Sequence, residues 1–153
     1  MLTTETIKSE FSYITAWTGS SESYHNTDKL LGHGELCDIY FNSKSGMLLQ
    51  AQVDTYNDFK INYNKYSSEI EKYIIDNLNS NQHSQIEKIK DSLLLFEVIS
   101  IPQENVKYDM VLVCSKSYKH LMFFTKNISV RVEFINRKIQ SIKITNDTTV
   151  DNN

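Results

Sequence analysis

The apolar residues between Gly46 and Asn79 recur at alternating steps of three and four positions. This spacing places them on one side of an α-helix and the polar residues on the other. The stripe contains Leu49, Val53, Tyr56, Phe59, Tyr63, Tyr66, Ile70, Tyr73, Ile74 and Leu78. Asn62 and Asn64 are weak helix formers near its middle, and a single helix of this length is rare in a small domain. Two helices, about 46–61 and 66–79, are therefore predicted.

The tyrosines of this stripe can be interpreted in two ways. Each phenol needs a hydrogen-bonding partner, which favours the edge of a buried seam over its dry centre. On one interpretation the helices lie on a sheet, and the hydroxyl groups reach solvent at the margin. On the other, the rings form an exposed patch that binds another protein, because tyrosine is common at interface hot spots.

Apolar runs with strand-like patterns lie on both sides of the helical segment. Before it, strands are predicted over 9–17 and 35–42, joined by a polar loop over 18–28. After it come a short helix and five strands, predicted over 83–91, the end of 93–101, 108–114, 121–124, 128–134 and 139–144. Asn136 is expected to take a positive φ in the turn between the last two strands.

The order of these elements predicts an α+β fold. The sheet is expected to be mostly antiparallel, built from N-terminal strands and a C-terminal meander, with the helical middle segment packed on one face. A chain of 153 residues suits one domain, here residues 1–145. Residues 146–153 are almost entirely polar and are expected to form a disordered tail.

The composition indicates the cellular location of the protein and the class of partner that it binds. No signal peptide or membrane span is recognised. Cys37 and Cys114 lie in strand-like apolar segments, where reduced thiols are common. A cytoplasmic protein is therefore predicted. Residues 1–105 carry 8 basic against 15 acidic side chains, and residues 106–153 carry 8 against 4. The net charge of −3 disfavours general nucleic-acid binding.

Motifs for cofactor and nucleophile chemistry are largely missing. Glycine does not occur after Gly46, which excludes phosphate-binding loops and dinucleotide fingerprints in that part, and no cofactor is expected. His33 and Glu35 could bind a metal if His25 or Asp38 joined them, although a structural turn explains them as well. A set of Cys114, His120 and Asp109 could be assembled only by the fold.

Charged residues also mark the C-terminal hairpin. Arg131 and Lys143 could contact an anionic partner, with further bases nearby at Lys126, Arg137 and Lys138. The alternative is a solvated strand face that Glu133 partly neutralises.

A further indication comes from the run Leu48-x-x-x-Gln52-x-x-x-Tyr56-x-x-Phe59, which follows Trp17-x-Gly19 and Leu30-Leu31-Gly32. This arrangement resembles a family of small bacterial domains of unassigned biochemistry, some members of which are predicted to be immunity proteins of polymorphic-toxin systems. The resemblance implies an α+β fold and a protein partner. Tyr118-Lys119-His120-Leu121 stands where that family has an acidic residue and a glycine around its histidine, so no catalytic residue is transferred.

These observations favour a non-enzymatic, cytoplasmic protein-binding module, an immunity protein that neutralises a toxin domain by direct contact. The expected partner contacts are Asp54, Asp58, Glu69, Asp76, Tyr66, Tyr118 and His120. One alternative is a small metal-dependent or hydrolytic enzyme that uses His33 and Glu35, or His120. Another is a homo-oligomeric structural module, such as a homodimer that pairs through the tyrosine stripe.

Overall fold

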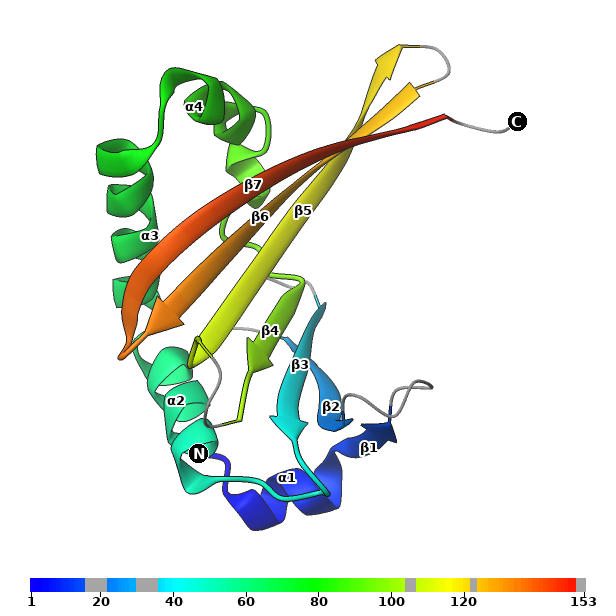
Figure 1. Cartoon of the computed structure of the whole chain (residues 1–153), viewed down its shortest axis with the longest axis vertical. Helices are drawn as coiled ribbons and strands as arrows, with labels where there is room; N and C mark the ends of the chain where they lie inside the picture. The colour runs from blue at the N-terminus through cyan, green and yellow to red at the C-terminus, as the bar shows by residue number, and fades with distance from the viewer. Residues whose placement is uncertain (16–21, 30–35, 104–106, 122–123, 151–153) are drawn as a thin grey trace.

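The computed structural model describes the chain apart from residues 16–21, 30–35, 104–106, 122–123 and 151–153. Within the described residues, seven strands form one sheet in the order of the sequence (Figure 1). They are β1 (Ser12–Thr15), β2 (Glu22–Lys29), β3 (Leu36–Ser43), β4 (Val98–Ile101), β5 (Met110–Leu121), β6 (Phe124–Ile135) and β7 (Lys138–Val150). The helices are α1 (Thr4–Glu10), α2 (Gln50–Ile61), α3 (Tyr63–Asn77) and α4 (Ser80–Glu87), followed by the 3₁₀ turn η1 (Lys90–Ser92). The fold is α+β, as predicted.

Neighbouring strands are antiparallel throughout the described sheet, except that β3 and β4 run parallel. In this parallel pair Ile39 lies opposite Ile99. Parallel neighbours require a long crossover, and α2, α3 and α4 supply it. The helical segment is therefore the connection between the two halves of the sheet.

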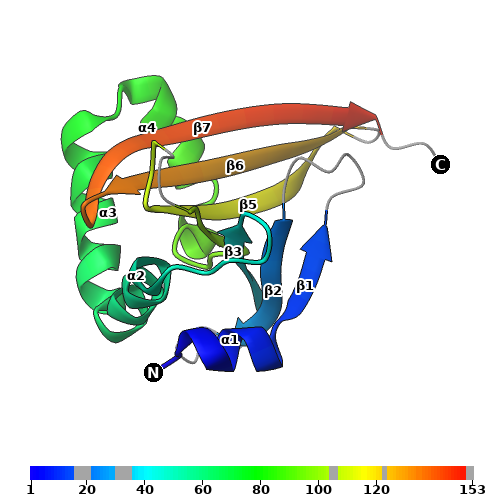
Figure 2. The same ribbon diagram turned by 60° about the horizontal axis from the view of Figure 1, so that its bottom comes forward.

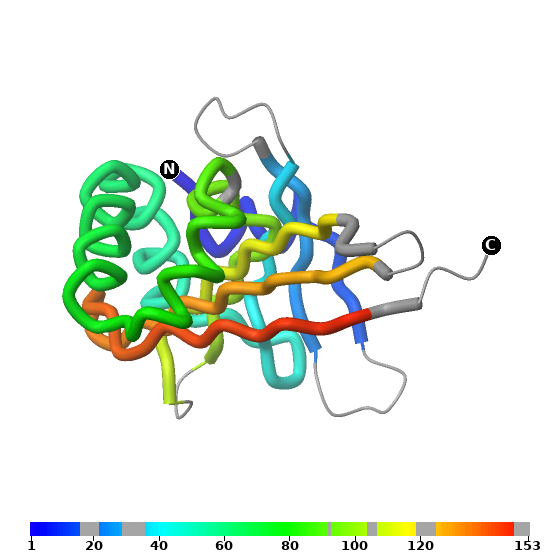
Figure 3. The backbone as a smooth tube through the Cα atoms, turned by 90° about the horizontal axis from the view of Figure 1, so that it is seen from above, coloured from blue at the N-terminus to red at the C-terminus, as the bar shows by residue number. Residues whose placement is uncertain are grey.

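The crossover helices lie along one side of the sheet (Figures 1 and 2). The row of apolar side chains beneath them crosses five strands through Ile39, Ile99, Leu112, Val132 and Ile142. Aromatic rings join the helices to this face, because Tyr56 packs edge-on to Phe41 and Tyr66 to Phe134. The far ends of β5, β6 and β7 extend away from the helices (Figure 3).

None of the helices in the described ranges combines the length and apolar composition that crossing a bilayer requires.

The tyrosine stripe belongs to this core. Tyr56 is 0 % exposed, Tyr66 3 % and Tyr63 6 %, and Tyr73 is half-buried beside them. Tyr56, Tyr63 and Tyr66 therefore pack inside the fold and do not form an exposed patch. Their hydroxyl groups do not reach solvent at the margin, because Tyr63 and Tyr66 donate to Leu94 and Asp58 and the Tyr56 hydroxyl is buried. Two helices are present, as predicted, but the first begins at Gln50, the second begins at Tyr63, and they meet at Asn62.

The N-terminal region differs from the prediction. Residues 18–28 were expected to form a loop, but Glu22–Lys29 is a strand that pairs with β1 and β3. Tyr24 is the one β2 side chain among the described residues that is buried, so the segment has no apolar alternation to reveal it. Its place in the sheet comes from backbone pairing on both sides. Helix α1 was also missed, because Ile7 is its single buried residue.

The C-terminal strands are longer than their apolar patterns indicate. Residues 118–120, which lie between two of the predicted strands, continue β5 to Leu121. The expected tail is wrong for residues 146–150, which pair with β6, whereas residues 151–153 lie outside the described part. Backbone hydrogen bonds extend a hairpin whatever the polarity of its side chains. The turn is as predicted, with Asn136 at φ 49° and Arg137 at φ 62°.

Candidate functional site

A hollow of about 340 Å³ lies between α3 and the start of β7. We call it the α3 groove. Tyr73 and Ile139 are half-buried there and pack against the core. Four charged side chains surround them, with one amide: Glu69, Lys72, Asp76, Lys138 and Asn77. The hollow therefore combines an apolar base with a polar margin.

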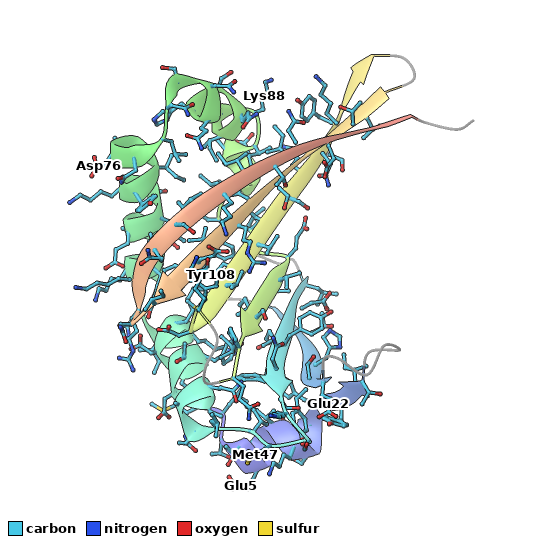
Figure 4. All side chains as sticks on the ribbon, in the orientation of Figure 1. Glu5, Glu22, Met47, Asp76, Lys88 and Tyr108 are labelled. Carbon is cyan, nitrogen blue, oxygen red and sulfur yellow. The ribbon has the colours of Figure 1, made fainter. Side chains whose placement is uncertain are left out.

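The helical period explains how α3 builds its side of the groove. Tyr66, Ile70 and Ile74 point into the core. Glu69, Lys72, Tyr73 and Asp76 follow one another at steps of three, one and three positions, which aligns them along the neighbouring side of the helix. Figure 4 shows Asp76 on the outer side of α3. Ile75 lies beside Asp76 in the sequence and is 72 % exposed.

Two of the predicted contact residues are occupied inside the fold. The Tyr66 hydroxyl donates a hydrogen bond to Asp58 Oδ2 at 2.7 Å, and burial, followed by this carboxylate, raises the pKa of Tyr66 far above its usual value. Asp58 also accepts from Asn62 at 3.0 Å and pairs with Arg137 at 3.4 Å. Tyr66 and Asp58 thus join the two helices to the β6–β7 turn, and Tyr66 is not accessible to a partner.

Asp54 lies on the other side of the same turn. It is exposed and accepts a hydrogen bond from Gln50 at 2.9 Å. A second hollow of about 390 Å³ is lined by Asp54, Ala51, Thr55, Asp109, Asn136 and Arg137. The fold therefore brings Asp54, Glu69 and Asp76 around the β6–β7 turn, although they are far from it in sequence.

Tyr118 and His120 are not part of this arrangement. Tyr118 lies within β5, is half-buried against the core, and has Lys88 Nζ 5.9 Å from its ring centre. Its buried hydroxyl has no hydrogen-bond partner among the described residues. His120 is on the same strand, but its side chain lies outside the described part.

The structure describes only some of the residues proposed for enzymatic chemistry. His33 and Glu35 lie outside the described residues. Cys114 is buried in the core and its thiol donates to the Leu93 carbonyl at 3.1 Å, whereas Asp109 accepts from the Arg137 backbone N–H. Among the side chains that the structure describes, no three of His, Cys, Asp or Glu are grouped to hold a metal ion.

His25 and Asp38 form a separate pair on the face of the sheet that α2 and α3 do not cover. His25 Nε2 lies 3.0 Å from Asp38 Oδ1, and Thr27 donates to the same oxygen at 3.0 Å. These bonds lower the pKa of Asp38. The His25 ring stacks on Tyr40 with 4.6 Å between ring centroids.

Sequence reasoning missed the burial of Glu133 on this same face. Its side chain is 1 % exposed, and its Oε1 accepts from Arg131 Nε at 2.8 Å and Lys143 Nζ at 2.9 Å. Burial raises the pKa of Glu133, but hydrogen bonds from Lys143, Ser141, Arg131 and Tyr108 outweigh it and lower the pKa to about 2. The solvated-face interpretation was correct in pairing these charges and in exposing Arg131 and Lys143, but wrong for Glu133, which is shielded from solvent. Arg131-x-Glu133 opposite Ser141-x-Lys143 was the available signal.

Comparison with known proteins adds no relative. No protein-family model, curated protein or solved structure matches the chain.

Proposed function

We propose that this protein is a non-enzymatic protein-binding module and that its partner docks in the α3 groove. The observation that carries the proposal is the composition of that groove. Tyr73 and Ile139 offer an apolar contact, and four charged side chains surround it. Protein interfaces share this plan, with aromatic and aliphatic anchors at the centre and polar groups at the rim.

The resemblance to bacterial immunity-type domains makes a toxin domain the proposed partner and the cytoplasm the proposed location. A partner that suits the groove presents an apolar side chain to Tyr73 and Ile139, with basic groups opposite Glu69 and Asp76. Asp54, on the far side of the β6–β7 turn, would extend the acidic contact. Asp58 and Tyr66 would support the surface from inside.

The test measures binding of the full chain to the separately purified product of the gene adjacent to its own. Asp76→Lys should slow association several-fold, because a rim charge acts mainly on the encounter rate. Tyr73→Ala should increase the dissociation rate at least about tenfold, as expected for a central aromatic anchor. Far-UV circular dichroism confirms that each variant is folded.

Glu71→Lys is the matched control for Asp76→Lys, since it reverses an exposed acid on α3 outside the groove. Binding that Asp76→Lys and Tyr73→Ala leave unchanged, or that Glu71→Lys weakens equally, would place the interface elsewhere. No binding to the neighbouring product would oppose the toxin partner. A stoichiometric metal ion in the purified protein would favour the enzyme alternative.

A further inference from the structure

The free edge of β7 is the longest unpaired strand edge of the described sheet. β7 covers Lys138–Val150 and pairs with β6 on one side only, whereas β1, at the other end of the sheet, covers Ser12–Thr15. An edge strand presents a row of backbone N–H and C=O groups that can pair with another strand.

The distal half of β7 has few of the features that normally protect such an edge, with Asp147 as its one charged residue. Proteins blunt edges with charged side chains, above all lysine, and with proline, bulges or a covering helix. The register irregularity with β6 lies at Glu133/Phe134, so the strand is regular from Ser141 onward. From Thr145 to Val150 it contains no proline or lysine, and residues 145–148 are exposed. The distal strand also extends away from the helices (Figures 1 and 3).

The charges on β7 select one pairing partner and one register. Lys143 and Asp147 are the two charged residues of its regular part, and both lie on the uncovered face. If β7 pairs antiparallel with a second β7 about a two-fold axis at Thr145, Lys143 of each copy lies opposite Asp147 of the other. An axis at Lys143 or at Asp147 would instead place like charges opposite one another. Opposite charges stabilise directly facing positions and like charges destabilise them.

We infer that two copies of this chain associate through β7, antiparallel and centred on Thr145, to form one continuous sheet across a two-fold axis. An isologous contact of this kind closes on itself, so it yields a dimer and not a fibre. Lys143 is already held by Glu133 at 2.9 Å, which fixes its side chain on the face where Asp147 of the second copy arrives.

The first test is the mass of the full chain in solution, by sedimentation equilibrium at about 10–100 µM. The expected result is a species of twice the 17.8 kDa chain mass. Asp147→Lys places lysines opposite each other twice and should weaken the dimer at least about tenfold. Glu71→Lys makes the same charge change on α3, outside the groove, and should not. A monomer throughout this range, or equal effects of the two variants, would overturn the inference.

Cysteine cross-linking tests the register. Under mild oxidation with oxidised glutathione, Thr145→Cys should give a covalent dimer, because residue 145 faces itself at the axis. Thr148→Cys should not, because residue 148 faces residue 142 of the other copy. The native thiols Cys37 and Cys114 are buried and serve as the background. Cross-linking of Thr148→Cys instead, or of neither variant, would refute this pairing even if a dimer is present.

Discussion

Lys143 Nζ lies 2.9 Å from Oε1 of Glu133, and the Glu133 side chain is 1 % exposed. The carboxylate is therefore held between β5 and β7 on the face that α2 and α3 leave uncovered, with Arg131 as its second cation at 2.8 Å. Breaking a buried, hydrogen-bonded charge network costs more than breaking an exposed ion pair. Glu133 thus holds three side chains, Arg131 on its own strand and Ser141 and Lys143 on β7.

Glu133→Gln should lower the free energy of unfolding at pH 7 by about 2 kcal/mol, below the value for a fully buried pair because both cations are half-exposed. The folded pKa of about 2 lies below the unfolded value of about 4.3. Ionised Glu133 therefore stabilises the fold fully above the unfolded pKa, and this contribution is lost as the pH falls through the folded pKa. Urea denaturation at pH 7, 4 and 2.5 should show that the difference in unfolding free energy between the parent protein and Glu133→Gln becomes smaller as the pH falls.

Glu69→Gln is the control for this measurement. Glu69 meets Lys65 at 4.0 Å with 41 % of its side chain exposed, so the change should alter stability by less than about 0.5 kcal/mol. An equal loss in both variants at pH 7 would mean that Glu133 is no more important than a surface acid.

Prediction from sequence succeeded where a period was strong. The three-and-four spacing of 46–79 located α2 and α3, and the alternation from Ile128 to Phe134 located the core of β6. It failed where pairing does not depend on side-chain pattern: β2 has one buried residue among those described, and distal β7 has exposed polar side chains. Backbone hydrogen bonding to neighbouring strands decides such segments, and single-strand periodicity does not report it.

The candidate site shows the same division. The polar sides of the helices already indicated Glu69 and Asp76, but Lys138 and Ile139 complete the groove from the other end of the chain. Tyr66 and Asp58 were chosen from the same helical period, yet the structure joins them to each other. Helical spacing separates core from surface, whereas the fold determines which polar residues near that boundary find partners.

Tyr66 and Tyr56 should respond in opposite ways to loss of the hydroxyl group. Tyr66→Phe removes the donor to Asp58 and should cost about 1.5 kcal/mol, as expected for a hydrogen bond to a charged acceptor. The Tyr56 hydroxyl is buried without a partner among the described residues. Tyr56→Phe should therefore be neutral, or stabilising by up to about 1 kcal/mol.

Chemical denaturation of both variants checks this contrast, and each variant is the other's control because the substitution is the same. The ring packing of each, on Phe134 for Tyr66 and on Phe41 for Tyr56, stays in place. Equal destabilisation of the two would show that the Tyr56 hydroxyl has a partner in solution.

The two thiols should be unreactive in the folded protein. Burial, assisted by nearby carboxylates, raises the pKa of Cys37 and of Cys114 to about 12 from an ordinary value of 9.0. The thiolate is the nucleophile, so its population at pH 8 falls by about a thousandfold. An aromatic disulfide reagent should therefore label an added Ser68→Cys thiol on exposed α3 quickly, and the native pair only in urea. Fast labelling of three thiols in buffer would contradict the buried placement.

Gln52→Glu should destabilise the fold in a pH-dependent way. The Gln52 amide is 4 % exposed, and its Nε2 donates to the carbonyls of Asn42 at 2.8 Å and Ile101 at 3.0 Å. A carboxylate there would face two acceptors with no proton to donate, which should cost about 3 kcal/mol at pH 7. Burial and the carbonyls favour the protonated form, so the folded pKa of the new carboxyl should lie above its unfolded value. The loss of unfolding free energy caused by Gln52→Glu should then be smallest below the unfolded pKa and grow as the pH rises.

Gln82→Glu is the matched control, because Gln82 accepts from the Asn79 backbone N–H in an exposed capping box where glutamate serves equally well. Unfolding free energies of both variants at pH 4 and pH 7 separate the two environments. Gln82→Glu should stay within about 0.5 kcal/mol of the parent at both values. If Gln52→Glu also left the unfolding free energy unchanged at both pH values, the hydrogen bonds of the Gln52 amide could not be what holds α2 to the ends of β3 and β4.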